Sequence, residues 1–161
     1  MDGLFVMDKC QNLCNMKHKS DINLLTETEK NASKIIRNIF VDIEKCGYSR
    51  QKPFIIGAVE DRMRKYAEEN SIELGSSDVY MSSHSLSHSE REHKVKIGKA
   101  VLKEDIIAFP MTRHKMDMSY DGEAFIFTDG KAKYVIHPNY AIKIDRKREK
   151  KVVFITATLL G

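Results

Sequence analysis

The last third of the chain, residues 121–161, constrains the fold most strongly, because a tight turn joins two segments that both have the pattern of a strand. Asp129-Gly130 stands between these segments, and this dipeptide is a strong signal for a β-hairpin. Two further turns are expected at residues 138–139 and 146–149. The strands predicted from this pattern cover residues 123–128, 131–137, 140–145 and 152–160. Together they indicate a four-stranded antiparallel meander.

Side chains alternate along a strand, so each predicted strand has an apolar row and an opposite row. The apolar rows are expected to pack on helices, which leaves the opposite rows on an open and basic face of the sheet. That face is predicted to carry Lys133, His137, Lys143, Thr156 and Thr158. From residue 131 onward, eight lysines and arginines stand against two acidic residues, so a polyanionic partner is expected to dock on this part of the chain.

Two long helices are predicted upstream of the meander. A capping box at residues 26–29 opens the first, and apolar residues then recur at helical spacing until Gly47 ends it. The second helix is expected to follow Pro53 in its first turn and to reach about residue 70.

Shorter elements are predicted between the long helices and the meander. Residues 79–81 have the composition of a strand, and a capping box at 87–90 opens a third helix that should end by Gly98. A short helix is expected over residues 102–109, stopped by Pro110 because proline disfavours helix in the residue before it.

We therefore expect an α+β fold in which N-terminal helices pack on one face of a C-terminal four-stranded antiparallel meander. The length of 161 residues and the 42% of hydrophobic residues suit one domain with its own core. Residues 1–20 are expected to form an N-terminal extension, and residues 21–161 the single α+β domain.

The sequence also limits where the protein is expected to work. No apolar run approaches the ~18 residues of a membrane-spanning helix, and the first residues lack the basic and apolar regions of a secretory signal. The three cysteines have no spacing typical of a disulfide framework. We expect a cytoplasmic protein with no membrane contact.

Two groups of residues have the spacing of metal ligands on a helix. Cys10, Cys14 and His18 follow one another at intervals of four, and so do His84, His88 and Glu92. Both sets lack the fourth ligand of a structural zinc site, and a docked helix or an exposed polar helix explains them as well. We predict no metal and no cofactor.

Cleavage of RNA without a metal needs a base for the ribose 2′-hydroxyl, a cation for the phosphorane oxygens and an acid for the leaving oxygen. The sheet offers His137, Lys143 and Thr156 for these roles, and the third helix offers a second set. That set consists of His88, Arg91 and Lys94. A simpler alternative also fits, because histidine beside proline suits a turn, threonine favours strands and lysines solvate an exposed sheet.

Four segments resemble the barnase, EndoU, colicin and RelE-like ribonuclease superfamily, in particular its phage and mobile-element members. They are Val79-Tyr80-Met81-Ser82, His88 to Lys94, Ile136 to Tyr140, and Phe154-Ile155-Thr156-Ala157. The resemblance covers about residues 78–160 and implies a small nuclease that acts on RNA, often tRNA, without a metal. His88 and Lys94 match the helix signature of the family, and Thr156 matches the polar residue of its last strand.

From these residues and this resemblance we expect a metal-independent endoribonuclease, toxin- or phage-associated, that works in the cytoplasm of the producing or the target cell. The expected catalytic residues are His88, Lys94, His137 and Thr156, and the expected RNA contacts are Arg91, Lys133, Tyr140, Lys143 and Thr158. The family also implies an inhibitor or immunity protein as a partner. The alternative is a non-catalytic nucleic-acid- or protein-binding module of a mobile element that uses the basic sheet face.

Overall fold

The structure is a computed structural model that describes the backbone of residues 19–161 and the side chains of residues 27–87 and 91–161. Its helices are α1 (Lys19–Cys46), α2 (Asp61–Glu69), α3 (His88–Lys96) and α4 (Lys103–Thr112), with 3-10 turns η2 (Ser83–Leu86) and η3 (Arg113–Lys115). Its strands are β1 (Phe54–Ala58), β2 (Asp78–Met81), β3 (Asp117–Tyr120), β4 (Phe125–Thr128), β5 (Ala132–Ile144) and β6 (Lys147–Leu159). The α+β class is therefore confirmed.

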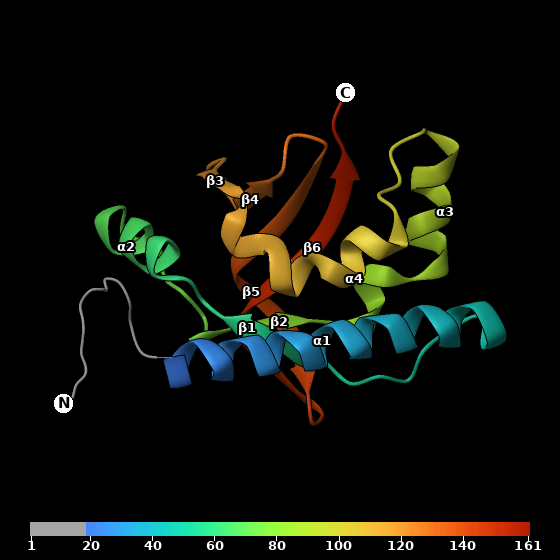
Figure 1. Ribbon diagram of the computed structural model, residues 1–161, viewed down its shortest axis with the longest axis horizontal. Coiled ribbons are helices and arrows are strands. Elements are labelled where there is room, and N and C mark those ends of the chain that lie inside the picture. The colour runs from blue at the N-terminus through green and yellow to red at the C-terminus, as the bar shows by residue number, and fades with distance from the viewer. Residues whose placement is uncertain (1–18) are drawn as a thin grey trace.

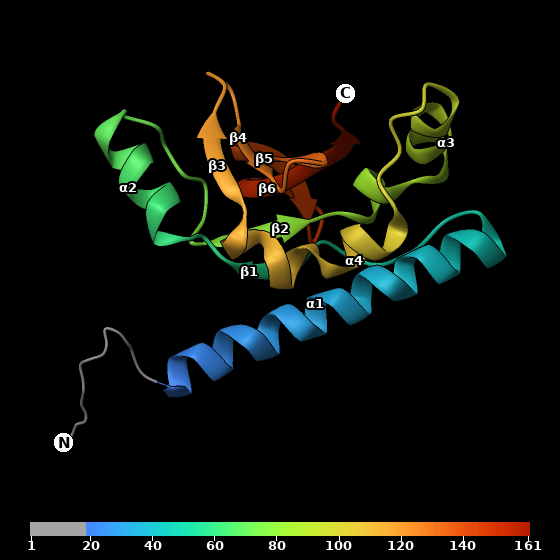
Figure 2. The same cartoon turned by 45° about the horizontal axis from the view of Figure 1, so that its top comes forward.

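The strands form one sheet in the order β1-β2-β6-β5-β4-β3 (Figure 1). β2 pairs with β6 in parallel, and the other neighbouring strands pair antiparallel. The prediction of a sheet built from four C-terminal strands alone is corrected. The predicted strands 131–137 and 140–145 are one strand, β5, while β1 and β2 extend the sheet on the β6 side and β3 extends it on the β4 side. In Figure 2, α1 crosses beneath the sheet, α4 lies between α1 and the sheet, and α2 and α3 lie at opposite sides of the molecule.

The hydrophobic core lies between one face of the sheet, here called the core face, and the helices α1 and α4. Phe109 of α4 occupies its centre, with its ring centroid 4.5 Å from Tyr134, 5.6 Å from Phe154 and 6.3 Å from Phe127. These side chains are all buried, as is Ile136 next to them on β5. Burial of large aromatic surface at this point holds α4 on three strands at once.

Both long helices predicted upstream of the meander are present, but their observed bounds differ from the predicted ones. α1 begins at Lys19, so the expected capping box at residues 26–29 lies inside the helix, whereas its end at Gly47 is confirmed by φ +83° and a bond from Gly47 N to Ile43 O. The helix expected after Pro53 starts only at Asp61. Residues 54–58 form β1 instead, because their apolar side chains pair in register with β2 and enter the core.

The shorter elements follow the prediction more closely. β2 and α3 lie where a strand and a capped helix were expected. α4, however, continues through Pro110 to Thr112. Pro110 and Phe109 are both buried, so packing in the core outweighs the local preference of proline to end the helix.

The hairpin around Asp129-Gly130 is confirmed, with a connection longer than two residues because Thr128 pairs with Lys133. The Asp129 carboxylate accepts bonds from the amides of Lys131 at 2.9 Å and Ala132 at 3.0 Å, which closes the turn. The next predicted turn, at residues 138–139, is wrong. β5 runs straight through it to Ile144, and the chain reverses at Asp145 and Arg146, which have φ of +48° and +70°.

Residues 138–139 form a β-bulge rather than a turn. The register passes from His137 opposite Val153 to Tyr140 opposite Lys151, so β5 takes three steps where β6 takes two. A bulge tolerates Pro138, which has no amide hydrogen to give to the ladder. The extra residue also reverses the faces beyond it, so that Lys143 lies on the face opposite His137 and Tyr140.

Burial of the core raises the pKa of Tyr134 to about 12, with the negative charges of Asp129 and Asp105 adding to the effect. A raised tyrosine pKa contributes stability that is complete below the unfolded pKa of about 10 and is lost as the pH rises towards the folded value. We expect the free energy of unfolding of the native chain, relative to Tyr134→Phe, to fall by about 1 kcal/mol between pH 9 and pH 11. Urea unfolding at both pH values measures this, with the exposed Tyr48→Phe as the matched control. An unchanged difference would mean that Tyr134 ionises equally easily in the folded and unfolded chains.

Candidate functional site

Lys94 of α3 lies against the last strand. Its Nζ donates to Thr156 Oγ1 at 2.7 Å, to the Ala157 carbonyl oxygen at 2.9 Å and to Thr158 Oγ1. These contacts join positions 62 to 64 residues apart in the sequence. We call Lys94, Thr156 and Thr158 the Lys94 cluster; it brings together two of the four predicted catalytic residues and one predicted RNA contact.

The sheet topology explains why α3 meets β6 here. β2 pairs with β6 at Val152 and Val153, and further along β6 the amide of Leu159 donates to the Lys99 carbonyl oxygen at 2.9 Å. The segment that follows α3 thus continues along the side of β6 on which β2 lies. A lysine that projects from α3 is therefore placed beside the β6 backbone and the threonines next to it.

Arg91 stands one helical turn before Lys94 on α3. Its Nη1 donates to the Val101 carbonyl oxygen at 2.6 Å, and burial lowers the pKa of its guanidinium from the ordinary value. Arg91, Lys94 and Thr156 line a cavity of about 30 Å³, enough for roughly one water molecule. A larger hollow of about 330 Å³ borders it, lined by Phe40, Ile43, Glu44, Leu86, Arg91, Glu92, Val95 and Lys103. Two cationic groups therefore lie side by side next to a surface hollow.

The outer face of the sheet, opposite the core face, carries most of the other predicted residues. Lys133 is paired with Thr158 across the strands, and Val135 with Thr156, so Lys133 borders the Lys94 cluster. His137 follows two residues further along the same face of β5. Lys143 pairs with Arg148 near the hairpin tip, about 30 Å along β5 from Lys133, and does not join this group.

A hydrogen bond within the β-bulge fixes the ring of His137. The amide of Asn139 donates to its Nδ1 at 3.1 Å, and the ring centroid of Tyr140 lies 5.3 Å away. A ring nitrogen that accepts a hydrogen bond carries no proton, so the neutral ring of His137 has its proton on Nε2. In this form His137 presents a hydrogen-bond donor at Nε2.

The side chain of His88 lies outside the described residues, as do Cys10, Cys14 and His18. α3 begins at His88, so the backbone of this residue opens the helix that carries Arg91 and Lys94. His84 belongs to the separate turn η2, so it does not share a helical face with Glu92. Among the side chains that the structure describes, there is no group of three or more His, Cys, Asp or Glu able to hold a metal ion.

The sequence interpretation missed two neighbours of His137. Lys151 pairs with Tyr140, and its Nζ lies 5.3 Å from the ring centroid of Tyr80 on β2. The alternation of side chains along residues 79–81 indicates that Tyr80 lies on the face opposite Val79 and Met81. The parallel pairing of β2 with β6, however, depends on contacts between residues far apart in the chain. That pairing is what brings Tyr80 to the outer face.

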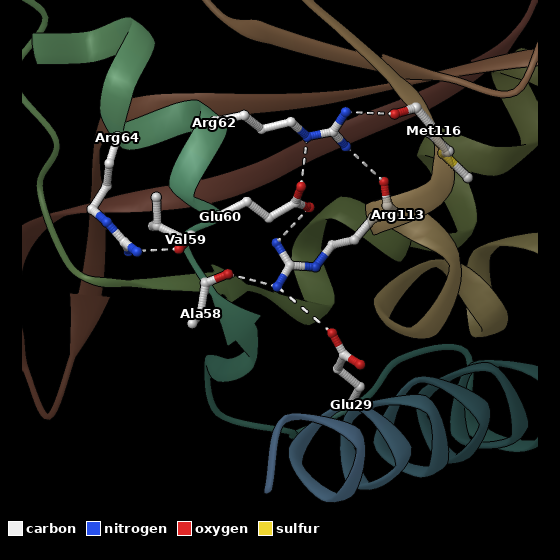
Figure 3. A network of polar contacts seen from close by, with 8 residues as sticks. All are labelled: Glu29, Ala58, Val59, Glu60, Arg62, Arg64, Arg113 and Met116. Carbon is white, nitrogen blue, oxygen red and sulfur yellow. Dashed lines mark hydrogen bonds and ion pairs between the residues drawn. The ribbon is translucent and has the colours of Figure 1, made fainter. Parts of the chain in front are cut away.

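A second polar network, shown in Figure 3, surrounds the buried Arg113 of η3. Arg113 Nη2 donates to the Ala58 carbonyl oxygen at 2.6 Å, and the guanidinium forms ion pairs with Glu60 at 3.4 Å and Glu29 at 3.9 Å. Arg62 donates to Glu60 at 2.7 Å and to the Arg113 carbonyl oxygen at 3.0 Å. These contacts tie α1, the β1–α2 connection and η3 together, so we assign the network to the fold.

No family model, no curated protein and no solved structure matches this chain. Along residues 19–161, none of the helices combines the length and the apolar character needed to cross a membrane. The Lys94 cluster and the outer face of the sheet are therefore the features of this chain that bear on its function.

Proposed function

We propose that the protein is a metal-independent endoribonuclease whose site lies where α3 meets β6. The observation that carries this proposal is the contact of Lys94 with Thr156 and Thr158. Lys94 and Thr156 are residues that resemble the signature of the barnase, EndoU, colicin and RelE-like ribonucleases, and they belong to segments far apart in the sequence. In the fold, Lys94 Nζ lies 2.7 Å from Thr156 Oγ1. Arg91 on the same helix and Lys133 on the adjoining strand add positive charge around them.

The residues of this region suit attack of a ribose 2′-hydroxyl on the adjacent phosphate. Lys94 stabilises the negative charge that develops on the phosphorane oxygens. A threonine hydroxyl that accepts from an ammonium group is polarised and becomes a better donor, so Thr156 and Thr158 orient the phosphate. His88 at the start of α3 is the candidate for proton transfer, and His137 offers a hydrogen-bond donor at Nε2.

The products of cleavage test this proposal most directly. Purified protein is incubated with tRNA and with a single-stranded RNA oligomer, both in the presence of a chelator. The expected result is discrete cleavage of RNA that leaves 2′,3′-cyclic phosphate ends, with a 2′-O-methylated oligomer of the same sequence left intact. A His88→Ala variant tests the proton transfer and a separate His137→Ala variant tests the hydrogen bond from Nε2, with the exposed His114→Ala as the matched control.

The second candidate, a binding module without catalysis, is favoured by the exposed Tyr140 beside His137 and by the basic residues of the sheet. Retained RNA binding without any cleavage product would support it. Absence of both cleavage and salt-sensitive binding would contradict both candidates, because a phosphate-binding surface loses affinity steeply as salt rises.

A further inference from the structure

Four side chains of three segments lie on the outer face of the sheet next to the bulge in β5, as two contacting pairs. Tyr140 and His137 have ring centroids 5.3 Å apart, and Lys151 Nζ lies 5.3 Å from the ring centroid of Tyr80. The register joins the two pairs, because Tyr140 is opposite Lys151 while Tyr80 and His137 both pair with Val153. We call these four residues the aromatic platform.

Backbone amides fix the position of the β5 residues of the platform. The amide of Gly75 donates to the Pro138 carbonyl oxygen at 2.9 Å, which fastens the bulge to the segment before β2. A Cβ on Gly75 would lie 2.6 Å from the Lys150 carbonyl oxygen, so this approach is as close as backbones allow. The Asn139 amide fixes the ring of His137 through Nδ1. The aromatic rings therefore need little ordering when a ligand binds.

Tyr140 is the exposed member of the platform, with 45% of its surface accessible. An exposed tyrosine ring beside a histidine that donates from Nε2 offers a stacking surface and one directed hydrogen bond. A nucleobase has both complementary features, a flat π-face and acceptor atoms at its edge.

The charges on either side of the platform favour a nucleic acid over an uncharged aromatic ligand. The β5–β6 tip beyond it carries five lysines and arginines against Asp145 and Glu149. Arg146 stands at the turn and Lys147 on the face of Tyr140, whereas Lys143, Arg148 and Lys150 lie on the opposite face. In the other direction along the sheet lie Lys133 and the Lys94 cluster. A strand of phosphates that crosses the platform would therefore run between two positively charged regions.

We propose that the aromatic platform binds one unpaired base of single-stranded RNA. The base stacks on Tyr140, His137 Nε2–H donates to an acceptor at its edge, and Tyr80 with Lys151 forms the side wall. This inference rests on the proposed function for the identity of the ligand, and it adds a base-recognition site beside the phosphate-binding Lys94 cluster.

The test compares two uncleavable oligomers of equal length and charge. One is 2′-O-methyl RNA of mixed sequence, and the other has the same backbone with abasic residues. Because both carry the same phosphates, the charge-dependent part of the affinity is the same for both. We expect the base-bearing oligomer to bind about tenfold tighter in fluorescence anisotropy, the size of one base stacked on an aromatic ring.

Variants of Tyr140 test whether the preference for the base-bearing oligomer depends on this ring. Tyr140→Ala is expected to weaken binding of the base-bearing oligomer about tenfold and to leave the abasic oligomer unchanged, whereas Tyr140→Phe keeps the native affinity. Tyr48→Ala, at an exposed position after α1, is the matched control and should alter neither. Thermal unfolding of each variant verifies that the fold is intact.

Equal affinity for the two oligomers, or equal loss of both in Tyr140→Ala, would overturn the aromatic platform. The result is independent of turnover, because neither oligomer has a 2′-hydroxyl to react. Base preference without cleavage of ordinary RNA contradicts the nuclease and retains the platform. Cleavage of ordinary RNA without base preference contradicts the platform and retains the nuclease.

Discussion

Replacing Lys94 with methionine is expected to lower the rate of RNA cleavage about a hundredfold to a thousandfold, the usual effect of removing one preorganised electrostatic group from beside a developing oxyanion. Methionine keeps most of the side-chain length and loses the ammonium group. The threonine hydroxyls then lose the cation that polarises them, so their help to the phosphate falls as well. Single-turnover cleavage of an RNA oligomer, with enzyme in excess, measures the chemical step.

Lys94 also bonds to the β6 backbone, so a loss of folding must be separated from a loss of chemistry. We expect Lys94→Met to cost about 1–3 kcal/mol in the free energy of unfolding, because it removes the donor of three acceptors, among them the Ala157 carbonyl oxygen. The matched control is Lys96→Met, an exposed lysine on the same helix, purified in the same way. If Lys94→Met stays folded and cleaves as fast as Lys96→Met, then Lys94 serves the fold alone, and any cleavage comes from another site or a contaminant.

Arg113→Met is expected to lower the free energy of unfolding by about 3–5 kcal/mol, the largest stability change that we predict. Arg113 is 2% exposed, and its removal leaves Glu60 and Glu29 facing each other without the cation between them. The Ala58 carbonyl oxygen loses its donor as well. Urea unfolding followed by circular dichroism measures the loss.

Two further variants are compared with Arg113→Met. Arg37→Met breaks a bidentate ion pair with Glu104 on the surface, at 3.1 Å, and is expected to cost no more than about 1 kcal/mol. Adding Glu29→Gln to Arg113→Met should recover part of the loss, because the carboxylate that faced Arg113 is then neutral, whereas Glu60 keeps Arg62 at 2.7 Å. A loss for Arg113→Met as small as for Arg37→Met would show that the buried network contributes little to the fold.

The pH dependence of the Arg113→Met variant follows from Glu29. Burial raises the pKa of the Glu29 carboxyl, the positive charge of Arg113 opposes this shift and Glu60 adds to it. Without Arg113 the pKa of Glu29 rises further, so protonation of the folded variant starts at a higher pH. The deficit of the variant is therefore expected to shrink as the pH falls through the raised pKa of Glu29.

Local signals in the sequence predict what a few neighbouring residues decide. The hairpin at Asp129-Gly130 needs a carboxylate that closes the turn and a glycine at positive φ, and both act within four residues. The start of α3 after its serine run and the end of α1 at Gly47 are equally local. The same reasoning fails at residues 54–58 and at Pro110, where burial in the core outweighs the local preference.

Other features were decided by contacts that no short segment contains. The bulge at residues 138–139 depends on how β5 pairs with β6, and it separates Lys143 from His137, which regular alternation had placed together. The parallel pairing of β2 with β6 places Tyr80 beside Val153, on whose other side His137 lies, and packing of three distant segments creates the network of Arg113.

The sequence by itself determined the α+β class, the C-terminal hairpin and the residue types of a basic face with histidine and threonine. Tertiary structure decided which of these residues meet: it joined Lys94 to Thr156 across 62 positions and moved Lys143 away. The physical reason is that turns and caps are fixed by short-range hydrogen bonds, whereas strand register and helix docking are chosen by the burial of the whole core.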